Sequence, residues 1–341
     1  MAVRDLVSVV IPNWNGKRFL TGCLDSLLRQ SYKLIEIVIV DNGSADGSVE
    51  FIQDNYKDVK LVRFETNTGF SKAVNRGITE SSGEFVVLMN NDTTADDNWL
   101  SELVKAIKQH PEAGSAGCKM LAYDDHRILD GAGDGYRRGG LPGRIGHREF
   151  DNGQFDTPRY ILGACGGAAL YRRSLFDDIG FFDEDYFAYL EDVDMGLRAQ
   201  SAGYKCIYVP TAIIYHLGCG TTGSGYSPLV VKLSARNNWN TIVKNIPDRL
   251  IWKFLPQIIW WQAYYLAVVT VRGGQVLPYL WGSLQSLMLF PKMFKKRLSI
   301  KAKRRVPVQY LEQMIIESER DLPESRTRLI QQELKLTHSG R

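Results

Sequence analysis

Short apolar runs alternate with stretches of helical periodicity through the first ninety residues of the chain. Residues 6–11, 35–40, 59–64 and 84–89 each have the length of a buried β-strand. Amphipathic intervals separate these runs, and strands that alternate with helices predict βαβ units. We therefore predict an α/β fold with a mostly parallel central sheet flanked by helices.

Polar residues and a proline follow three of these strands directly: Pro12, Asn13 and Asn15 after the first, Asp41 after the second, and Asn90, Asn91 and Asp92 after the fourth. Ligands of open α/β sheets bind outside the carboxyl ends of the strands, so we expect these side chains to line one crevice. A carboxylate flanked by two amides suits a hydrated divalent cation. An ordinary turn with Asp as a helix cap explains the last cluster equally well.

Asp41 has the position at which an acidic residue accepts hydrogen bonds from a ribose in dinucleotide-binding folds. However, no G-x-G-x-x-G follows the first strand, and no G-x-x-x-x-G-K-[ST] occurs in the sequence. These absences argue against a dinucleotide dehydrogenase and a P-loop phosphotransferase. A nucleotidyltransferase is disfavoured as well, because no glycine- and lysine-rich phosphate loop follows the first strand.

A second acidic cluster lies about a hundred residues downstream and contains Glu191, Asp192 and Asp194. One positioned carboxylate is enough to remove a proton from a hydroxyl group during transfer with inversion. The alternative is a solvated helix start, where acidic residues favour the helix dipole. Asp194 and Arg198 have the spacing of an ion pair on one helix.

Six segments of the chain, in this order, resemble the inverting family-2 glycosyltransferases of the GT-A type, and among them the rhamnosyltransferase-like branch that builds bacterial surface polysaccharides. They are VVIPNWN at 9–15, VDNGS at 40–44, NTGFSKAVNRG at 67–77, LMNND at 88–92, GGAALYRR at 166–173 and GFFDEDYFAYLEDVD at 180–194. The resemblance covers about residues 5–220 and implies a GT-A fold. It also implies transfer of a sugar, with rhamnose favoured, from a dTDP- or UDP-sugar to a hydroxyl group of a lipid-linked saccharide.

The resemblance also implies roles for single residues. Asp192 is the expected base, and Glu191 is expected to orient the acceptor or Asp192 itself. Asp41 is expected to bind the base or ribose of the donor, and Lys72 its diphosphate. The rest of the expected donor-binding site consists of Pro12, Asn13, Asn15, Asn67, Gly69, Asn90 and Asn91.

The metal site departs from the family pattern, in which the motif is Asp-x-Asp. Asn90 replaces the first aspartate, so only Asp92 offers a charge to the cation. The resemblance implies that His216 joins Asp92 on one Mg or Mn ion, whereas a lone histidine at a strand end is more often structural. The change at position 90 leaves open a second function, a non-catalytic nucleotide-binding or scaffold protein on the same fold.

Glycine-rich segments lie between these clusters. Residues 130–144 contain too many glycines for a helix or a central strand, so we expect a mobile loop. We expect Arg144 in this loop to contact a phosphate of the donor. The alternative is that the loop extends from the surface into solvent. Gly166 and Gly167 allow the backbone to approach a sugar closely, although tight packing alone also explains them.

The last hundred residues differ in composition from the rest. Residues 241–341 contain 17 Lys and Arg against 7 Asp and Glu, a formal charge of +10 in a chain whose total is +4. Two uncharged stretches, 254–271 and 275–290, precede a basic cluster at 292–305. This order favours helices that lie on an anionic membrane surface, and the apolar stretches argue against nucleic acid as the partner. A helical hairpin that covers a homo-oligomer interface or the enzyme's own core remains the alternative.

Composition fits a globular enzyme of 341 residues, with 44% hydrophobic and 23% charged residues. We predict a catalytic domain over residues 1–235, a membrane-associating helical region over 236–305 and an amphipathic tail over 306–341. The five cysteines include no C-x-x-C pair and are expected to be reduced thiols. No apolar signal segment follows Met1, so we expect a cytoplasmic protein, peripheral on the inner face of the cell membrane.

Overall fold

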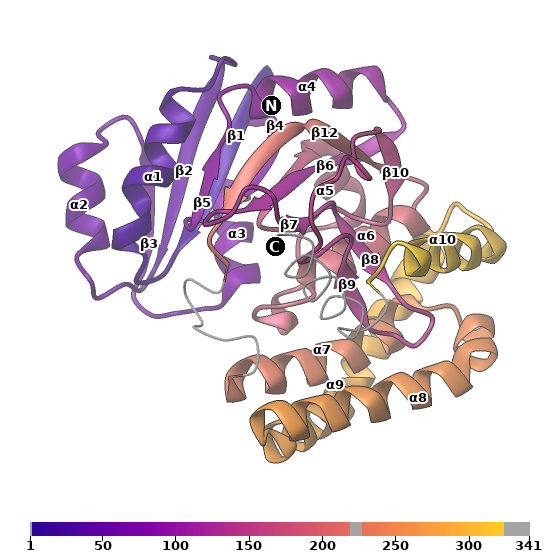
Figure 1. Ribbon diagram of the computed structural model, residues 1–341. Coiled ribbons are helices and arrows are strands. Elements are labelled where there is room, and N and C mark those ends of the chain that lie inside the picture. The colour runs from indigo at the N-terminus through magenta and orange to yellow at the C-terminus, as the bar shows by residue number, and fades with distance from the viewer. Residues whose placement is uncertain (1, 219–226, 324–341) are drawn as a thin grey trace, which may run out of the picture.

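A twisted β-sheet runs through the centre of the protein, with helices on both of its faces (Figure 1). The computed structural model describes residues 2–218 and 227–323. Its strands follow the order β10-β12-β6-β11-β4-β1-β2-β3, with β5 paired to β12 and β7 paired to β6. Cys219 and the end of the predicted tail, residues 324–341, lie outside the described residues.

The first half of the sheet is parallel, as the sequence predicts. β1 pairs with β2 and β4, and β2 pairs with β3. Alternate residues of β1 face opposite sides, so Val9 joins the core cluster under α1, α2 and α4, while Val10 joins the cluster under α3, α5 and α6. The elements are β1 Val3–Asn13, α1 Lys17–Leu28, β2 Ile35–Asn42, α2 Ser48–Asn55, β3 Lys60–Phe64, α3 Phe70–Glu80 and β4 Gly83–Met89.

The second half of the sheet is mixed. β6 and β12 are parallel, whereas β11 runs antiparallel between β4 and β6, and β10 and β5 are antiparallel to β12. The α/β class with flanking helices is confirmed, and its sheet is less uniformly parallel than the amino-terminal pattern indicates. The elements are β5 Thr93–Ala95, α4 Trp99–Gln109, β6 Ala113–Ala122, β10 Arg159–Ile161, β11 Ala168–Arg172, α5 Arg173–Ile179, η1 Glu184–Tyr186, α6 Glu191–Ser201 and β12 Lys205–His216.

The prediction of a mobile loop over residues 130–144 is wrong. The segment forms β7 Leu129–Gly131, β8 Asp134–Tyr136 and β9 Pro142–Arg144; β7 pairs with β6, and β8 pairs with β9. A Cβ atom at Gly135 would lie 2.8 Å from the Leu322 side chain, and one at Gly143 would lie 3.0 Å from it. These glycines therefore serve close packing and not flexibility.

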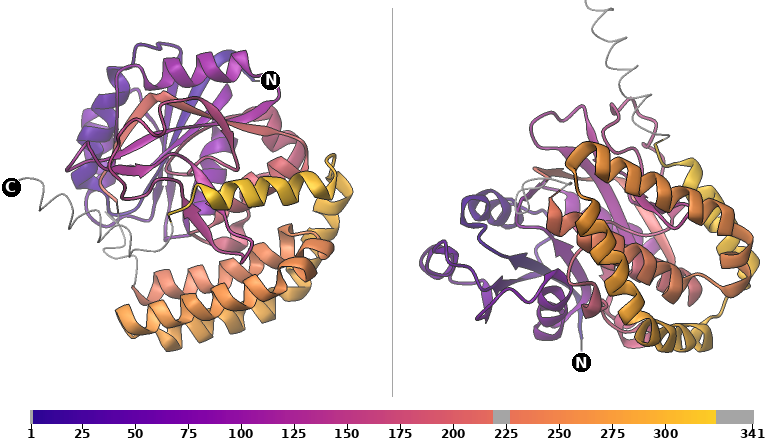
Figure 2. Two further views of the ribbon diagram at one scale, coloured as in Figure 1. Left: turned by 45° about the vertical axis from the view of Figure 1, so that its right-hand side comes forward. Right: turned by 90° about the horizontal axis from the view of Figure 1, so that it is seen from below.

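Within residues 227–323, four helices follow the sheet: α7 Pro228–Asn245, α8 Asp248–Gly273, α9 Val276–Lys303 and α10 Val308–Arg320. The two predicted apolar helices exist and are longer than the predicted stretches. α8 begins before residue 254 and contains Pro256, and α9 continues through Pro291 into most of the basic cluster. The predicted boundary between residues 235 and 236 lies inside α7. Figure 2 shows α7, α8 and α9 side by side along one end of the molecule.

These helices are packed into the rest of the protein. Leu250, Phe254 and Ile258 of α8 share a buried cluster with Leu162 and with Val193 of α6. α10 joins the same cluster through Leu311 and Ile315, and the hydroxyl group of Ser318 accepts a hydrogen bond of 2.8 Å from the Tyr136 backbone N–H. α7, α8 and α10 thus share a buried cluster with α6 and β8, and α9 joins α7 and α8 in a smaller buried cluster through Tyr279.

We predict that Gly282→Ala destabilises the protein by about 1–3 kcal/mol. A Cβ atom at position 282 of α9 would lie 2.2 Å from the backbone oxygen of Lys232 in α7, so the two helices would have to separate. Urea denaturation provides the measurement. Gly22→Ala in α1 is the matched control, because its new Cβ atom would meet only Thr94 at 3.6 Å. Gly22→Ala is expected to raise the free energy of unfolding by up to about 1 kcal/mol through helix propensity. If both substitutions stabilise the protein, α7 and α9 are not closely packed at Gly282.

Candidate active site

A cavity of about 490 Å³ opens at the carboxyl ends of β1 and β4 and is closed on its far side by α6 and α7. The structure brings most of the predicted site residues together on its wall. Leu229 and Leu233 of α7 add an apolar side to it. The predicted residues that line it are Pro12, Asn13, Asn67, Gly69, Asn90, Asn91, Asp92, Arg144, Gly166, Gly167, Glu191, Asp192 and His216.

Three predicted donor-binding residues do not line the cavity. Asp41 is buried and accepts hydrogen bonds from the Asn13 side chain, at 3.1 Å, and from the Ser44 backbone, at 3.1 Å. Asn15 is exposed, and its side-chain oxygen accepts from the Ala45 backbone at 2.8 Å. Lys72 is exposed on α3, with its ammonium 5.9 Å from the centre of the Phe64 ring. Asp41 and Asn15 thus join the loops after β1 and β2, and the donor roles of all three stay predictions.

Amide side chains build the wall at the ends of β1 and β4. Asn91 donates to the Asn13 side-chain oxygen at 2.7 Å. Asn42, which sequence reasoning missed, donates to the Asn67 side-chain oxygen at 3.1 Å, and that oxygen also accepts from the Gly69 backbone at 2.9 Å. Gly69 has φ +91°, and a Cβ atom there would lie 2.6 Å from the Phe187 ring. The glycine therefore allows α3 to begin directly against the opposite wall.

Asp92 and His216 face each other across the antiparallel β5–β12 pairing. The His216 Nε2 atom lies 3.4 Å from Asp92 Oδ1, and both side chains are buried. His216 Nδ1 lies 2.7 Å from the carboxylate of Asp130, a residue that the sequence analysis did not single out. Although burial lowers the pKa of His216, its hydrogen bonds to Asp130 and Asp92 raise that pKa to about 9.

Asp130, the middle residue of β7, holds the His216 side chain in place. Its carboxylate forms an ion pair with Arg144, and the Asp130 backbone oxygen lies 2.8 Å from His147 Nδ1. Burial opposes ionisation of Asp130, but the hydrogen bond with His216 and the charge of Arg144 hold its pKa well below the usual range. Arg144 therefore lines the cavity with a guanidinium group already paired to a carboxylate.

Asp192 lies at the start of α6, with both carboxylate oxygens held by backbone N–H groups. Oδ2 accepts from Gly166 at 2.9 Å, and Oδ1 accepts from Val193 at 2.8 Å. A Cβ atom at Gly166 would lie 3.3 Å from the Asp192 side chain. Gly166 therefore lets the backbone approach the predicted base closely, in addition to lining the cavity.

Two further carboxyl groups surround Asp192. Asp134 is buried, and desolvation together with the charge of Asp192 raises its pKa well above the usual value. Glu191 is also buried; desolvation and the same charge raise its pKa, and its Oε2 atom has no hydrogen-bond partner among the described residues. Ligand atoms of Asp134, Cys165 and Asp192 lie within 4.8 Å of one another. Burial raises the pKa of the Cys165 thiol as well, so burial opposes the ionised, cation-binding form of both Asp134 and Cys165.

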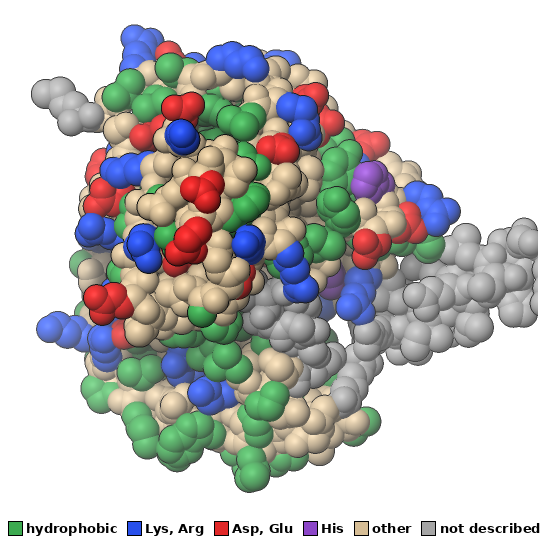
Figure 3. Space-filling view, turned by 90° about the vertical axis from the view of Figure 1, so that its left-hand side faces the viewer, with side chains coloured by type: hydrophobic (Ala, Val, Ile, Leu, Met, Phe, Trp, Pro, Cys, Tyr) green, Lys and Arg blue, Asp and Glu red, His purple; other side chains and the backbone are tan. Residues whose placement is uncertain are grey.

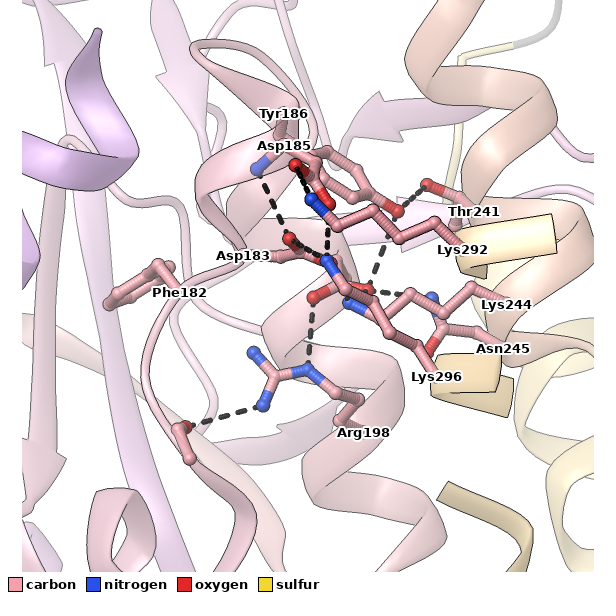
Figure 4. A network of polar contacts seen from close by, with 12 residues as sticks. Phe182, Asp183, Asp185, Tyr186, Arg198, Thr241, Lys244, Asn245, Lys292 and Lys296 are labelled. Atoms are coloured by element: carbon pink, nitrogen blue, oxygen red, sulfur yellow. Dashed lines mark hydrogen bonds and ion pairs between the residues drawn. The ribbon is translucent and has the colours of Figure 1, made fainter. Parts of the chain in front are cut away.

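A buried ionic network fixes the start of α6 (Figure 4). Asp194 has no exposed surface, and Arg198 donates to it at 2.9 Å, which confirms the predicted ion pair. Lys244 of α7 lies 2.7 Å from Asp194 and 2.6 Å from Asp183. Lys296 of α9 pairs with Asp183 as well. The network thus connects α6, α7 and α9 a short distance along the chain from Asp192.

An α/β sheet that ends in a cavity with amides on one wall, a buried carboxylate–histidine pair beside it and an acidic helix start opposite defines the class of GT-A glycosyltransferases. The chain belongs to glycosyl transferase family 2, whose family model matches residues 8–180. The predicted family, the GT-A fold and the enzyme class are confirmed.

Similar proteins include a rhamnosyltransferase and an O-antigen biosynthesis protein. The N-acetylglucosaminyl-diphospho-decaprenol L-rhamnosyltransferase of Mycobacterium tuberculosis is 29% identical over 244 residues, which are 64% of this chain and 78% of that protein. The O-antigen biosynthesis protein RfbC of Myxococcus xanthus is 30% identical over 224 residues, 62% of this chain and 17% of that protein.

Two solved structures share the fold. GalNAc-T7 with UDP, GalNAc and Mn2+ has a TM-score of 0.58 and 19% identity, and the match covers 71% of this chain and 48% of that one. The mannosyltransferase PcManGT from Pyrobaculum calidifontis, in complex with GDP-Man and Mn2+, has a TM-score of 0.54 and 18% identity, with 88% of this chain and 86% of that one covered.

Proposed function

We propose that the protein is a metal-dependent, inverting glycosyltransferase that moves a sugar from a nucleoside diphosphate to a hydroxyl group of a lipid-linked saccharide. The observation that carries this proposal is that Asp192 and the Asp92–His216 pair line the same cavity as the amide wall of Asn13, Asn67 and Asn90. A donor that lies along the amides has its diphosphate at the pair and its sugar toward Asp192.

The donor atoms of Asp92 and His216 fit a divalent cation, whose binding would displace the proton that Asp92 and Asp130 stabilise on the imidazole. Two ligands bound to one ion at about 2.1 Å lie about 3 Å apart, close to the 3.4 Å between His216 Nε2 and Asp92 Oδ1. Asp130 at 2.7 Å from Nδ1 orients the ring as outer carboxylates do for metal-bound histidines. An imidazole ligand favours Mn over Mg. When bound, the cation stabilises the charge that develops on the leaving diphosphate.

Asp192 takes the proton in this proposal. Its carboxylate removes the proton of the acceptor hydroxyl group while that oxygen attacks the anomeric carbon. The bond between the anomeric carbon and the diphosphate oxygen breaks, and the configuration inverts. The Gly166 N–H at 2.9 Å holds the carboxylate in place. Desolvation and the charge of Asp192 raise the pKa of Glu191 beside it, and in its protonated form Glu191 is suited to donate a hydrogen bond to the acceptor and so to orient it.

The relatives favour a particular pair of substrates. The mycobacterial protein is named as a rhamnosyltransferase that acts on a diphospho-decaprenol-linked sugar, and the name of RfbC places it in O-antigen biosynthesis. We therefore propose rhamnose as the favoured sugar, carried by dTDP or UDP, and a polyprenyl-diphosphate-linked saccharide as the acceptor. Because such an acceptor lies in a membrane, we propose that the enzyme works at the membrane surface, on the cytoplasmic face of the cell membrane.

Helices α8 and α9 offer a surface for that membrane. Among the described residues one helix segment, Asp248–Val271, is long and apolar enough to cross a bilayer, by length and composition alone. Green side chains gather at the lower end of the molecule in Figure 3, while charged groups of both signs are scattered over the part above. The apolar face consists of Trp252, Ile259, Trp260, Tyr264 and Val271 of α8 and Leu277, Leu280, Trp281, Leu284, Leu287, Met288, Phe290, Phe294 and Leu298 of α9.

We propose that this apolar face lies in the membrane surface without crossing it. The opposite side of α8 packs through Leu250, Phe254 and Ile258 into the core beside α6, so α8 cannot leave the protein without opening that core. A helix that is apolar on one exposed side and fixed to protein on the other is suited to interfacial binding. Exposed apolar side chains gathered on two neighbouring helices are typical of an interaction site.

Asp192→Asn tests the proposed base. The substitution keeps the shape of the side chain and removes the proton acceptor, so turnover is expected to fall about 10²- to 10⁴-fold. Donor affinity, measured by calorimetry with a panel of nucleotide-sugars, is expected to stay within about twofold of the wild type. If Asp192→Asn keeps most of the turnover, the base is another group, with Glu191 the next candidate.

Asp92→Ala and His216→Ala test the proposed metal site. Each is expected to weaken Mn-dependent donor binding, and the double variant is expected to lose less than the sum, because both ligands act through one ion. Thermal stabilisation by donor with and without Mn gives the readout. The two residues do not share an ion if their losses of donor binding are additive. The same follows if chelators do not change donor binding by the wild type.

Trp260→Glu combined with Leu287→Glu tests the membrane surface. These side chains are 68% and 70% exposed, so the substitutions leave the core intact and place charge in the apolar face. Flotation with vesicles that contain anionic lipid is expected to drop at least about tenfold. Leu28→Glu is the matched control, because the Leu28 side chain is exposed at the end of α1, and this variant should float like the wild type. If the wild type does not float and the double variant instead turns a dimer into a monomer, the face is a subunit interface.

A further inference from the structure

We propose that Asn237 of α7 is a positioning residue that holds residues 186–190 in the conformation that shapes the cavity and leads the chain into Asp192. The loop's contribution to catalysis rests on the proposed function. The holding itself rests on contacts alone: the amide of Asn237 donates to the backbone oxygens of Tyr186 at 3.0 Å, Ala188 at 3.0 Å and Tyr189 at 2.8 Å.

The loop needs holding because its backbone is strained. Phe187, Tyr189 and Leu190 have φ values of +63°, +71° and +68°, although none of them is glycine. Side chains with a Cβ atom rarely adopt this left-handed region, and such conformations persist only where the surroundings over-determine them. Phe187, Tyr189 and Leu190 all line the cavity, and Asp192 follows two residues after Leu190. The strain is therefore concentrated next to the proposed reaction centre.

Asn237 is itself fixed, so it can act as a rigid support. Its side chain is fully buried. The neighbouring Arg236 donates from Nε to the Asn237 amide oxygen at 3.0 Å and from Nη2 to the Tyr186 backbone oxygen at 2.7 Å. Because the amide oxygen accepts from a guanidinium group, the NH₂ group must face the loop. An asparagine amide is thus directed to three carbonyl groups at and just after η1, where the chain forms no regular helix or strand over residues 187–190.

The other side of the loop contacts the proposed donor side of the cavity. The Phe187 backbone oxygen accepts from the Ser71 N–H at 3.1 Å, at the start of α3. The Phe187 ring fills the space where a Cβ atom of Gly69 would lie. The loop is consequently held between α7 and the amino end of α3, and its position sets the distance from the donor wall to Asp192.

Asn240, one turn later on α7, provides a matched comparison. It is also fully buried, but its side-chain oxygen accepts from Ser286 of α9 at 2.8 Å and so supports helix packing instead of the loop. Removal of either amide costs the protein a buried hydrogen bond. Of the two, only removal of the Asn237 amide takes hydrogen bonds away from residues 186–190.

Hydrogen exchange of the full-length protein, followed by mass spectrometry without any substrate, measures the holding directly. In Asn237→Ala and Asn237→Asp, exchange in peptides that cover residues 183–192 is expected to accelerate about tenfold relative to the wild type. Asn237→Asp is included because a carboxylate has the same shape but cannot donate to carbonyl groups. In Asn240→Ala the same peptides are expected to exchange as in the wild type.

Kinetics measure the consequence for catalysis. In both Asn237 variants kcat is expected to fall about 10- to 100-fold and the acceptor KM to rise, while donor Kd stays within about twofold. Wild-type exchange and turnover in Asn237→Asp would overturn the proposal, as would equal losses of turnover in Asn237→Ala and Asn240→Ala. If Asn237→Ala does not fold, Asn237→Asp decides. If the wild type transfers no sugar from any donor, the proposed function fails and the exchange result still tests the positioning role.

Discussion

The charge of Asp194 is the constraint on which the arrangement of the site depends. Its carboxylate has no exposed surface, and a buried charge is tolerated only when it is paired and hydrogen-bonded. Arg198 of the same helix supplies one partner, and Lys244 and Asn245 of α7 supply the others at 2.7 and 2.8 Å. Since Asp194 follows Asp192 by two residues, the need to neutralise it brings α7 against the start of α6.

The same network ties the peripheral helices to the cavity. Lys244 bridges Asp194 to Asp183, and Lys296 of α9 also pairs with Asp183, so η1 is anchored from two helices. The strained loop runs from η1 to α6 and is therefore fixed at both ends by charge. Asn237 then acts on its middle through the backbone oxygens of Ala188 and Tyr189.

Features that depend on local patterns follow from the sequence, and features that depend on distant contacts do not. The strands of residues 6–11 and 84–89, the polar clusters after them and the Asp194–Arg198 pair all arise within a few residues of chain. Asp130 binds His216 from 86 positions away, within a segment whose glycines indicate flexibility. Leu322, far along the chain, fills the space that those glycines leave. No periodicity predicts such pairings.

The distribution of charge also changes once the partners are known. The formal excess of +10 over residues 241–341 suggests a surface held to lipid mainly by electrostatic attraction. However, Lys292 and Lys296 pair with Asp185 and Asp183, and Arg297 pairs with Asp248. These cations stabilise the carboxylates of η1 and α8, so less positive charge faces outward than the composition indicates. In the proposed membrane contact, exposed apolar area on α8 and α9 would then supply most of the affinity. Lys292 and Lys296, which resemble part of a lipid-binding cluster, instead hold the carboxylates before the loop of residues 186–190.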